Sequence, residues 1–395
     1  MQQAAPATGY IFRSVGHVEA GAGCLRRLGA LTARFAGAPG RAPVLLVTDP
    51  AVCAGGLLEP ALQSLQDAGF AIRVFDQICA DAPDHLVLRA CRRARDDGVA
   101  AVVGLGGSAC LDAAKITACM AHPRQSLQLS QLYGVDSLEP RRLPLLQVPT
   151  TAGSGSEVSR VAVLTTGETT RSGIVNRALL ADAALLDPQL TVSQPADATA
   201  ANGMDAMAHA VEAFTSAHAK NPMSDMLARE ALGLLGSSLL RAVQRGDDLG
   251  ARERMLRGAM LAGMAFDNAP LAAVHALGYP LGLRHRLAHG LSNALVLPHV
   301  LRFNLPAAAP RYAELAQVLL PQAGGDTPSR AHALIDHLAA LCRRSGLPTR
   351  LRDCGIAQSG LALLAREAMA QQRLLRNNPC TLTEADALGV YRAAF

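Results

Sequence analysis

Short apolar runs that alternate with helical patterns constrain the first half of this chain most strongly. The runs at 42–49 and 99–104 are apolar along nearly their whole length, so each suits a parallel strand that is buried on both faces. A third strand pattern lies at 71–75, and helical patterns at 57–68 and 85–97 separate the three. Because strand and helix alternate, the sequence predicts an α/β domain with a parallel sheet.

Strand patterns continue at 143–148, 160–165 and 183–187 and then stop, whereas helical patterns run almost to the C-terminus. With 395 residues, the chain is long enough for two domains that each bury a core. We expect a dinucleotide-binding α/β domain at 1–190 and an all-α domain at 191–395. Glycine and proline are expected to break the helices of the second domain at Pro222, Gly278, Pro280 and Pro298.

Composition excludes several classes of protein. No apolar run reaches about eighteen residues, so we predict no membrane-spanning helix. Residues 1–8 lack the basic and apolar regions of a signal peptide, which favours a short disordered lead into a cytoplasmic protein. The nine cysteines form no C-x-x-C pair, as is typical of a reducing compartment. With no tryptophan and five tyrosines, the chain has few side chains for stacking on bases, and we expect no nucleic-acid partner.

Three loops at strand ends are candidates for ligand binding. Gly104–Lys115 is a glycine-rich turn that opens a helix, which suits either a pyrophosphate site or a tight structural turn, and it lacks the G-x-G-x-x-G spacing. Asp49 ends the run at 42–49, where an acid can accept hydrogen bonds from ribose hydroxyls and favour NAD over NADP, or can simply cap the turn before Pro50. The polar loop Pro149–Glu157 is either a second ligand-binding loop or an ordinary connection.

A carboxylate and three imidazoles point to a metal site in the helical half. Asp205 and His209 are four residues apart on one helix face, among small apolar residues where an unpaired carboxylate would be costly. With His275 and His289 they would offer the oxygen and nitrogen ligands that a divalent first-row metal prefers. The alternative is a hydrogen-bonded Asp/His pair with structural histidines elsewhere. We expect the Gly278 and Pro280 breaks to place the last two histidines on separate segments.

Four segments together resemble the iron-containing, group III alcohol dehydrogenases: 149–158, 203–213, 274–278 and 289–295. The resemblance implies a Rossmann-like N-terminal domain related to that of dehydroquinate synthase, a helical C-terminal domain and an active-site cleft between them. It implies Fe²⁺ as the metal, although Zn²⁺ suits the same ligands. The implied metal ligands are Asp205, His209, His275 and His289, and the implied cofactor-binding residues are Asp49, Gly106, Gly107, Ser108, Asp112, Thr150, Thr151, Ser154 and Arg171.

The chain departs from the family pattern at a few positions near these residues. Ser108 stands where the family has a glycine, Arg171 where a lysine is common, Tyr279 where a histidine often follows the third ligand, and Ala288 where a proline precedes the fourth. The Tyr279 hydroxyl is a candidate for passing a proton or orienting the substrate, and the alternative is a packing role. Asp267, close in sequence to the implied substrate pocket, suggests a polar substrate if it does not face solvent.

The resemblance implies an NAD-dependent oxidoreductase that interconverts a small alcohol and its aldehyde or ketone, with the metal as a Lewis acid on the substrate oxygen. A homodimer or higher homo-oligomer is the expected assembly. Three alternatives stay open: a maleylacetate-reductase-like enzyme, a dehydroquinate-synthase-like lyase and a catalytically silent nucleotide-binding protein. The lyase is disfavoured because Lys115 and Lys220 are the only lysines.

Overall fold

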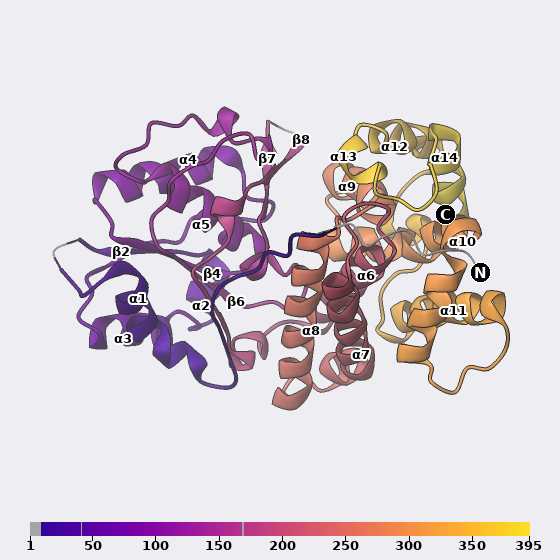
Figure 1. The fold of residues 1–395 in the computed structure, drawn as a ribbon, viewed down its shortest axis with the longest axis horizontal. Helices are drawn as coiled ribbons and strands as arrows, with labels where there is room; N and C mark the ends of the chain where they lie inside the picture. The colour runs from indigo at the N-terminus through magenta and orange to yellow at the C-terminus, as the bar shows by residue number, and fades with distance from the viewer. Residues whose placement is uncertain (1–8, 41, 168–169) are drawn as a thin grey trace.

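The computed structural model describes residues 9–40, 42–167 and 170–395, so the predicted lead at 1–8 lies outside the described residues. Figure 1 shows two parts side by side: a sheet flanked by helices, built from the first half of the chain, and a bundle of helices built from the second. The predicted fold class is therefore confirmed. The exact domain limits, 1–190 and 191–395, remain a prediction.

The first part is built on a six-stranded sheet in the order β1-β9-β6-β4-β2-β3, and all its neighbouring strands are parallel. The four central strands of this order are buried along their whole length, as the apolar runs predict for a sheet covered on both faces. The strands are β1 (Val18–Ala20), β2 (Val44–Val47), β3 (Ile72–Phe75), β4 (Ala101–Gly106), β6 (Leu145–Pro149) and β9 (Ala183–Leu186).

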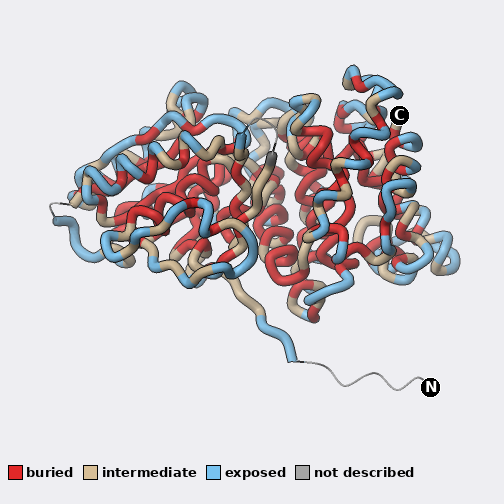
Figure 2. Tube along the Cα trace, turned by 90° about the horizontal axis from the view of Figure 1, so that it is seen from above, coloured by how far each residue is buried: buried red, intermediate tan, exposed pale blue. Residues whose placement is uncertain are grey.

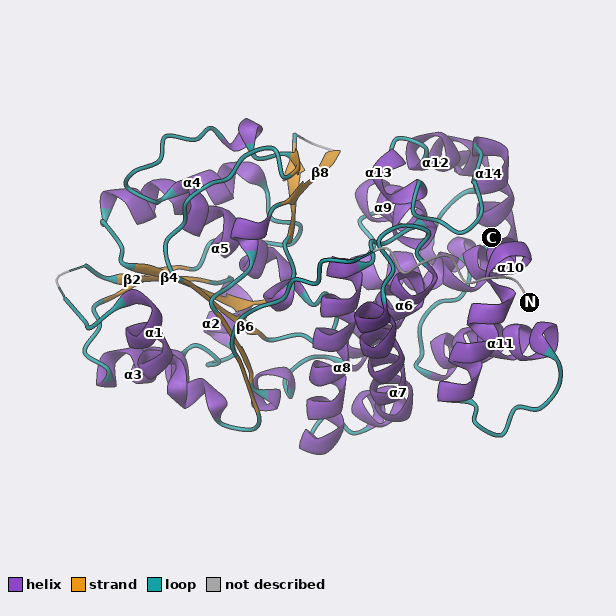
Figure 3. Cartoon of the chain, viewed as in Figure 1, coloured by secondary structure: helices purple, strands orange, loops and turns teal. Residues whose placement is uncertain are grey.

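Helices cover both faces of the sheet, because successive strand residues point to opposite faces. In β2, Val44 and Leu46 pack into one apolar cluster, whereas Leu45 and Val47 pack into the other. The first face is covered by α1 (Leu28–Ala36) and α3 (Glu59–Asp67), and the opposite face by α4 (Asp84–Asp96) and α5 (Ser108–Met120), as Figure 3 shows. The short helix α2 (Pro50–Ala54) follows β2 directly.

A small second sheet lies between the large sheet and the helical part. Its order is β5-β8-β7, in which β7 (Val161–Thr166) and β8 (Thr170–Val175) form an antiparallel hairpin and β5 (Gly134–Val135) runs parallel to β8. The sequence predicted β7 but not β8 or β5, because β8 is polar over half its length and β5 is very short. This hairpin carries Arg171 into the region between the two parts.

The second part is built from helices, and Figure 2 shows buried segments in its interior and exposed segments along its outside. Its first helix, α6 (Ala196–Thr215), is buried along most of its length. Small residues at its surface, mostly alanine and glycine, allow neighbouring helices to approach it closely. No described helix is long and apolar enough to cross a membrane. The helices are α6 (Ala196–Thr215), α7 (Pro222–Gln244), α8 (Leu249–Asn268), α9 (Ala273–His285), α10 (His289–Leu319), α11 (Thr327–Arg344), α12 (Leu361–Ala368), α13 (Gln372–Leu375) and α14 (Glu384–Ala393).

The predicted helix breaks were wrong at most of their positions. Pro280 and Gly278 lie inside α9 and Pro298 lies inside α10, whereas Pro222 is the first residue of α7. A proline has a helical φ and costs a helix one hydrogen bond and a contact with an earlier carbonyl, and the burial of α9 from 273 to 282 outweighs this cost. His275 and His289 do lie on separate helices, but the break between them is at Arg286, whose φ is 54°.

Candidate metal centre and cofactor cleft

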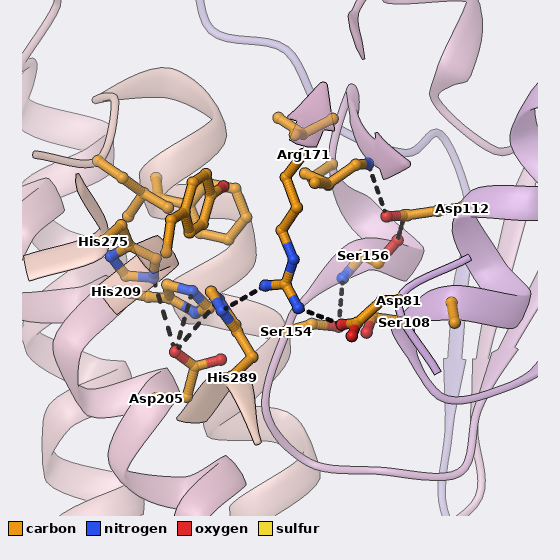
Figure 4. A pocket seen from close by; sticks show the side chains of 17 residues that line it. Asp81, Ser108, Asp112, Ser154, Ser156, Arg171, Asp205, His209, His275 and His289 are labelled. Atoms are coloured by element: carbon orange, nitrogen blue, oxygen red, sulfur yellow. Dashed lines mark hydrogen bonds and ion pairs between the residues drawn. The ribbon is translucent and has the colours of Figure 1, made fainter. Parts of the chain in front are cut away.

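Four side chains from three helices converge in the centre of the molecule (Figure 4). Asp205 and His209 come from α6, His275 from the first turn of α9, and His289 is the first residue of α10. One nitrogen or oxygen atom from each lies within 4.8 Å of the others. Around Asp205 Oδ1, the Nε2 atoms of His209, His275 and His289 lie at 3.7, 3.6 and 3.9 Å. The structure thus brings together all four predicted metal ligands.

Glu212 orients His275. Its Oε2 accepts a hydrogen bond from His275 Nδ1 at 2.6 Å, which leaves Nε2 facing Asp205. Its two oxygens also accept from the backbone N–H groups of Ala272 and Val274 at the start of α9. A carboxylate that both holds the helix start and fixes the imidazole tautomer is a frequent partner of metal-ligating histidines. The sequence pattern did not single out Glu212, although an acid in an apolar helix, three residues after His209, was an available signal.

Asn293 orients the carboxylate. Its Nδ2 donates to Asp205 Oδ1 at 2.7 Å and lies 3.3 Å from His289 Nε2. A Cβ at Gly278 would lie only 2.0 Å from Asn293 Oδ1, so the absence of a side chain there allows α9 to pack against Asn293. Gly278 therefore allows close helix packing. The sequence pattern suggested a helix break there, but α9 continues through this residue.

The charges of the four side chains depend on one another. Burial lowers the pKa of His209 and of His289 to about 4, against the opposing effect of Asp205. Burial alone would raise the pKa of Asp205, but the imidazoles outweigh it and hold that pKa far below its usual range. Burial also lowers the pKa of His275, but Glu212 and Asp205 outweigh this effect and raise it to about 9. At neutral pH His209 and His289 are therefore neutral and Asp205 is a carboxylate, which are the forms that bind a metal ion.

These residues fit a divalent metal. His275 Nε2 is buried and has no hydrogen-bond partner within 3.5 Å in the described part of the chain, although it faces Asp205. A buried ring nitrogen without a partner is costly, and a metal ion among the four side chains would satisfy it. The donor set has no thiolate, which suits Fe²⁺ or Zn²⁺ equally well.

A cavity runs from the metal centre to the carboxyl ends of β2 and β4. Asp205 and His289 lie at one end, and the opposite part is lined by Asp49, Gly107, Ser108, Thr151 and Ser154. Ser108 is the first residue of α5, so the positive end of this helix faces the cavity. Backbone N–H groups at such a terminus suit a pyrophosphate.

Asp49 caps α2, as the structural alternative predicted. Its Oδ1 accepts hydrogen bonds from the backbone N–H groups of Ala51 and Val52 at 2.9 Å, and Cys110 Sγ donates to its Oδ2 at 3.2 Å. It also lines the cavity, so the cap does not remove it from the cofactor region. Its predicted contact with the cofactor ribose remains a prediction.

The other predicted cofactor residues differ in how far they reach the cavity. Gly106 has a φ of 152°, and a Cβ there would lie 2.7 Å from Cys110 Sγ. Thr150 is buried, and its N–H donates to Gly106 O. Asp112 lines the cavity at the metal centre, but its oxygens accept from Ser156 Oγ at 2.6 Å and from the Val163 N–H at 2.9 Å. Asp112 therefore fixes the polar loop to α5 and β7, and its predicted cofactor contact is untested.

Arg171 spans the region between the two parts of the molecule (Figure 4). Its guanidinium pairs with Asp81, and its Nη1 lies 3.5 Å from His289 Nδ1. It also lies over the ring of Tyr279, 5.8 Å from the ring centre, and the ring of Tyr279 is 5.8 Å from that of His289. The sequence gave no signal for Asp81, whose φ of 65° marks an unusual loop conformation.

Two family models match the chain. One describes iron-containing alcohol dehydrogenases and matches residues 16–188, and the other describes the C-terminal part of the Fe-containing alcohol dehydrogenase family and matches 199–395. The chain belongs to the iron-containing alcohol dehydrogenase family. The resemblance predicted from the four sequence segments is thereby confirmed, and with it the prediction of an alcohol dehydrogenase.

Relatives of known name are similar over most of their length. Long-chain-alcohol dehydrogenase 1 of Geobacillus thermodenitrificans is 39% identical over 358 residues, 89% of each chain. A crystal structure of 1,3-propanediol oxidoreductase superposes with a TM-score of 0.93 at 32% identity, covering 98% of this chain and all of that one. A sulfoacetaldehyde reductase from Bifidobacterium kashiwanohense, solved in complex with NAD⁺, gives a TM-score of 0.86 at 26% identity, covering 98% of this chain and 99% of that one.

Proposed function

We propose that this alcohol dehydrogenase uses NAD and a bound Fe²⁺ to interconvert a small alcohol with its aldehyde or ketone. The observation that carries the proposal is the four-ligand centre at one end of a cavity whose other end holds the start of α5 and the polar loop. A metal and a dinucleotide bound there would lie in the same cavity. The related reductase that was solved with NAD⁺ supports the same cofactor.

Asp49 supports NAD over NADP. Its carboxylate lines the cavity and would repel a 2′-phosphate while accepting hydrogen bonds from ribose hydroxyls. Ser108, Thr151 and Ser154 offer hydroxyls along the same wall. Ser108 in place of the family's glycine adds a side chain at the helix start, which reduces the space for a pyrophosphate.

When bound, the metal would act as a Lewis acid on the substrate oxygen, and NAD would accept the hydride. The residues of this chain hold and orient these groups. Asp205, His209, His275 and His289 would hold the metal, while Glu212 and Asn293 fix the directions of His275 and Asp205. Phe266, Leu271 and Val161 line the cavity beside the ligands with apolar groups, which would strengthen the electrostatic interactions inside once ligands fill it.

Tyr279 is the proposed donor of a hydrogen bond to the substrate. It is buried beside His289 in the cavity wall. Burial raises the pKa of its hydroxyl, although Arg373 and Arg171 oppose that shift. The proton therefore stays on Tyr279 Oη at neutral pH, where it is available to orient a substrate oxygen.

The alternatives are less well supported. A maleylacetate-reductase-like enzyme need not keep the four ligands, all of which are present here. A silent nucleotide-binding protein would not need a buried metal centre adjoining the cavity.

We further propose that the protein is a homodimer or a higher homo-oligomer in the cytoplasm, and that it binds neither a membrane nor a nucleic acid.

The test is a steady-state assay of protein loaded anaerobically with Fe²⁺ or Zn²⁺. Oxidation of C2 to C8 alcohols should appear as NADH absorbance, and His275→Ala should lose both the metal and the activity. Metal-loaded protein that binds NAD but oxidises none of these alcohols would count against the proposal, as would full activity in the His275→Ala variant. Elemental analysis of protein purified without added metal would distinguish iron from zinc.

A further inference from the structure

A second cavity adjoins the one at the metal centre. The two share the side chains of Val161, Phe266, Leu271 and Tyr279. The second cavity extends toward β5, the end of β8 and the segment of α13, and both apolar and charged side chains line this extension. Its remaining lining residues are Val135, Arg160, Val175, Asp267, Pro270, Arg373, Leu374, Arg376 and Asn377.

The only carboxylate in this lining is already neutralised. Asp267 accepts from Arg160 Nε at 2.9 Å and from the Arg160 backbone N–H at 2.8 Å, so each of its oxygens has a partner. Its side chain is fully buried. The ion pair with Arg160 therefore occupies the carboxylate of Asp267, and the expectation that Asp267 favours a polar substrate stays a prediction.

Two arginine side chains in this lining have no carboxylate partner in the described part of the chain. No ion pair of the described residues includes Arg373 or Arg376, which are three residues apart at α13. Arg373 is half-buried, and a Cβ at Gly173 would lie 3.2 Å from its Nη2. The guanidinium thus lies against β8 where the strand has no side chain. The guanidinium lines the cavity with no carboxylate of the described ranges paired to it, so it is available to bind an anionic ligand.

We propose that the second cavity binds an anionic group at the far end of the substrate, with Arg373 as the main contact and Arg376 at the rim. The preferred substrates would then be ω-hydroxycarboxylates and the corresponding aldehydes. This inference rests on the proposed alcohol dehydrogenase function. The carboxylate keeps its charge throughout, since the oxidation removes a hydride and a proton only at the hydroxyl end, with NAD as the acceptor of the hydride.

The chemistry of the lining favours this class of substrate. A guanidinium binds a carboxylate through two parallel hydrogen bonds, which gives both affinity and orientation. The four shared side chains border both cavities and are mostly apolar, so the methylene chain between the hydroxyl and the carboxylate would pack against them. A neutral alkanol of the same length would make the same apolar contacts but leave Arg373 without a partner.

The experiment compares n-alkanols with ω-hydroxycarboxylates of four to eight carbons, using the metal-loaded enzyme and NAD. We expect the best hydroxycarboxylate to exceed the alkanol of equal length in kcat/KM by about tenfold or more, the scale of one charge-assisted contact. Arg373→Gln should abolish this preference, because it should lower kcat/KM for the hydroxycarboxylate by about tenfold or more relative to kcat/KM for the alkanol. Arg366→Gln removes an exposed charge on neighbouring α12, outside the cavity, and serves as the matched control.

Binding of hexanoate, measured by calorimetry, provides a readout that does not depend on turnover. Hexanoate should bind to the native protein. Its affinity should be about tenfold or more weaker for Arg373→Gln, and Arg373→Lys should restore part of that affinity. Oxidation of alkanols without any preference for hydroxycarboxylates would overturn the inference and leave the proposed function intact. Equal losses on both substrate classes in Arg373→Gln would show a structural role instead. If neither class is oxidised, the proposed function fails, and the hexanoate measurement still decides whether the cavity binds an anion.

Discussion

Glu212 Oε2 lies 2.6 Å from His275 Nδ1, and the same carboxylate accepts two backbone hydrogen bonds from the start of α9. The residue that fixes the helix start therefore also fixes the direction of a predicted metal ligand. Because α6 carries Glu212 together with Asp205 and His209, one helix positions three of the four predicted ligands.

Replacement of Glu212 should lower the affinity of the protein for a divalent metal. Glu212→Gln keeps the size of the side chain but removes the charge that holds the proton on His275 Nδ1. We expect about 10-fold to 100-fold weaker Zn²⁺ binding, the usual effect of losing such a partner, measured by competition with a chromogenic chelator. Glu230→Gln, at an exposed position of α7, is the control. Unchanged affinity in Glu212→Gln would contradict the orienting role.

Gly278→Ala should destabilise the protein because its Cβ would lie 2.0 Å from Asn293 Oδ1. Overpacking of this kind costs about 1–3 kcal/mol, and it would displace the amide that holds Asp205. Gly389→Ala in α14 is the matched control, since a Cβ there meets nothing within 4 Å, and it should stabilise by about 0.5–1 kcal/mol. Chemical denaturation of both variants measures the difference. Equal stabilities would show that α9 has room to shift.

Glu157 should make the stability depend on pH. Burial raises the pKa of this fully buried carboxyl to about 7, against the opposing effects of a backbone hydrogen bond and Lys115. A raised pKa means that the folded state binds the proton more tightly, so this contribution is complete below the unfolded pKa, near 4.5, and is lost as the pH rises to about 7. The lost stability is on the order of 3 kcal/mol.

Glu157→Gln removes this titration. The melting temperature of the variant, relative to the native protein, should therefore rise between pH 5 and pH 8, whereas Glu230→Gln should show no such trend. Differential scanning fluorimetry across this range makes the comparison. A relative melting temperature of Glu157→Gln that falls with increasing pH would mean that the buried carboxylate is stabilised in its charged form.

Asp49→Asn separates the two roles of Asp49. Asparagine is as good an N-cap as aspartate, so α2 should keep its first turn and the melting temperature should change little. Removing the negative charge should raise the ratio of kcat/KM with NADP to that with NAD by about tenfold or more, equivalent to about 1.4 kcal/mol. An unchanged ratio would leave Asp49 with the capping role alone, which the structure shows directly.

Local pattern was enough for five of the six strands of the large sheet, but it did not predict β1, which is only three residues long and is not fully buried. The apolar runs predicted the buried strands β2 and β4, because a strand that is covered on both faces carries apolar residues at successive positions instead of alternating apolar and polar ones. It failed for β8, whose polar residues pair with β7 in a hairpin at the edge of the cleft. It also failed at Pro280, since the burial of α9 depends on helices that are distant in sequence.

The sequence by itself determined the four candidate metal ligands, because Asp205 and His209 sit in a segment too apolar to leave a carboxylate unpaired, and His275 and His289 lie in segments that match the family pattern. Only the tertiary structure decided how they are held. Glu212, Asn293 and Asp81 act through contacts with residues far away in the chain, and no local spacing encodes such pairs. The same reason explains Asp267 and Arg373: whether a charge is paired or free depends on which elements pack against it, and that is a property of the fold.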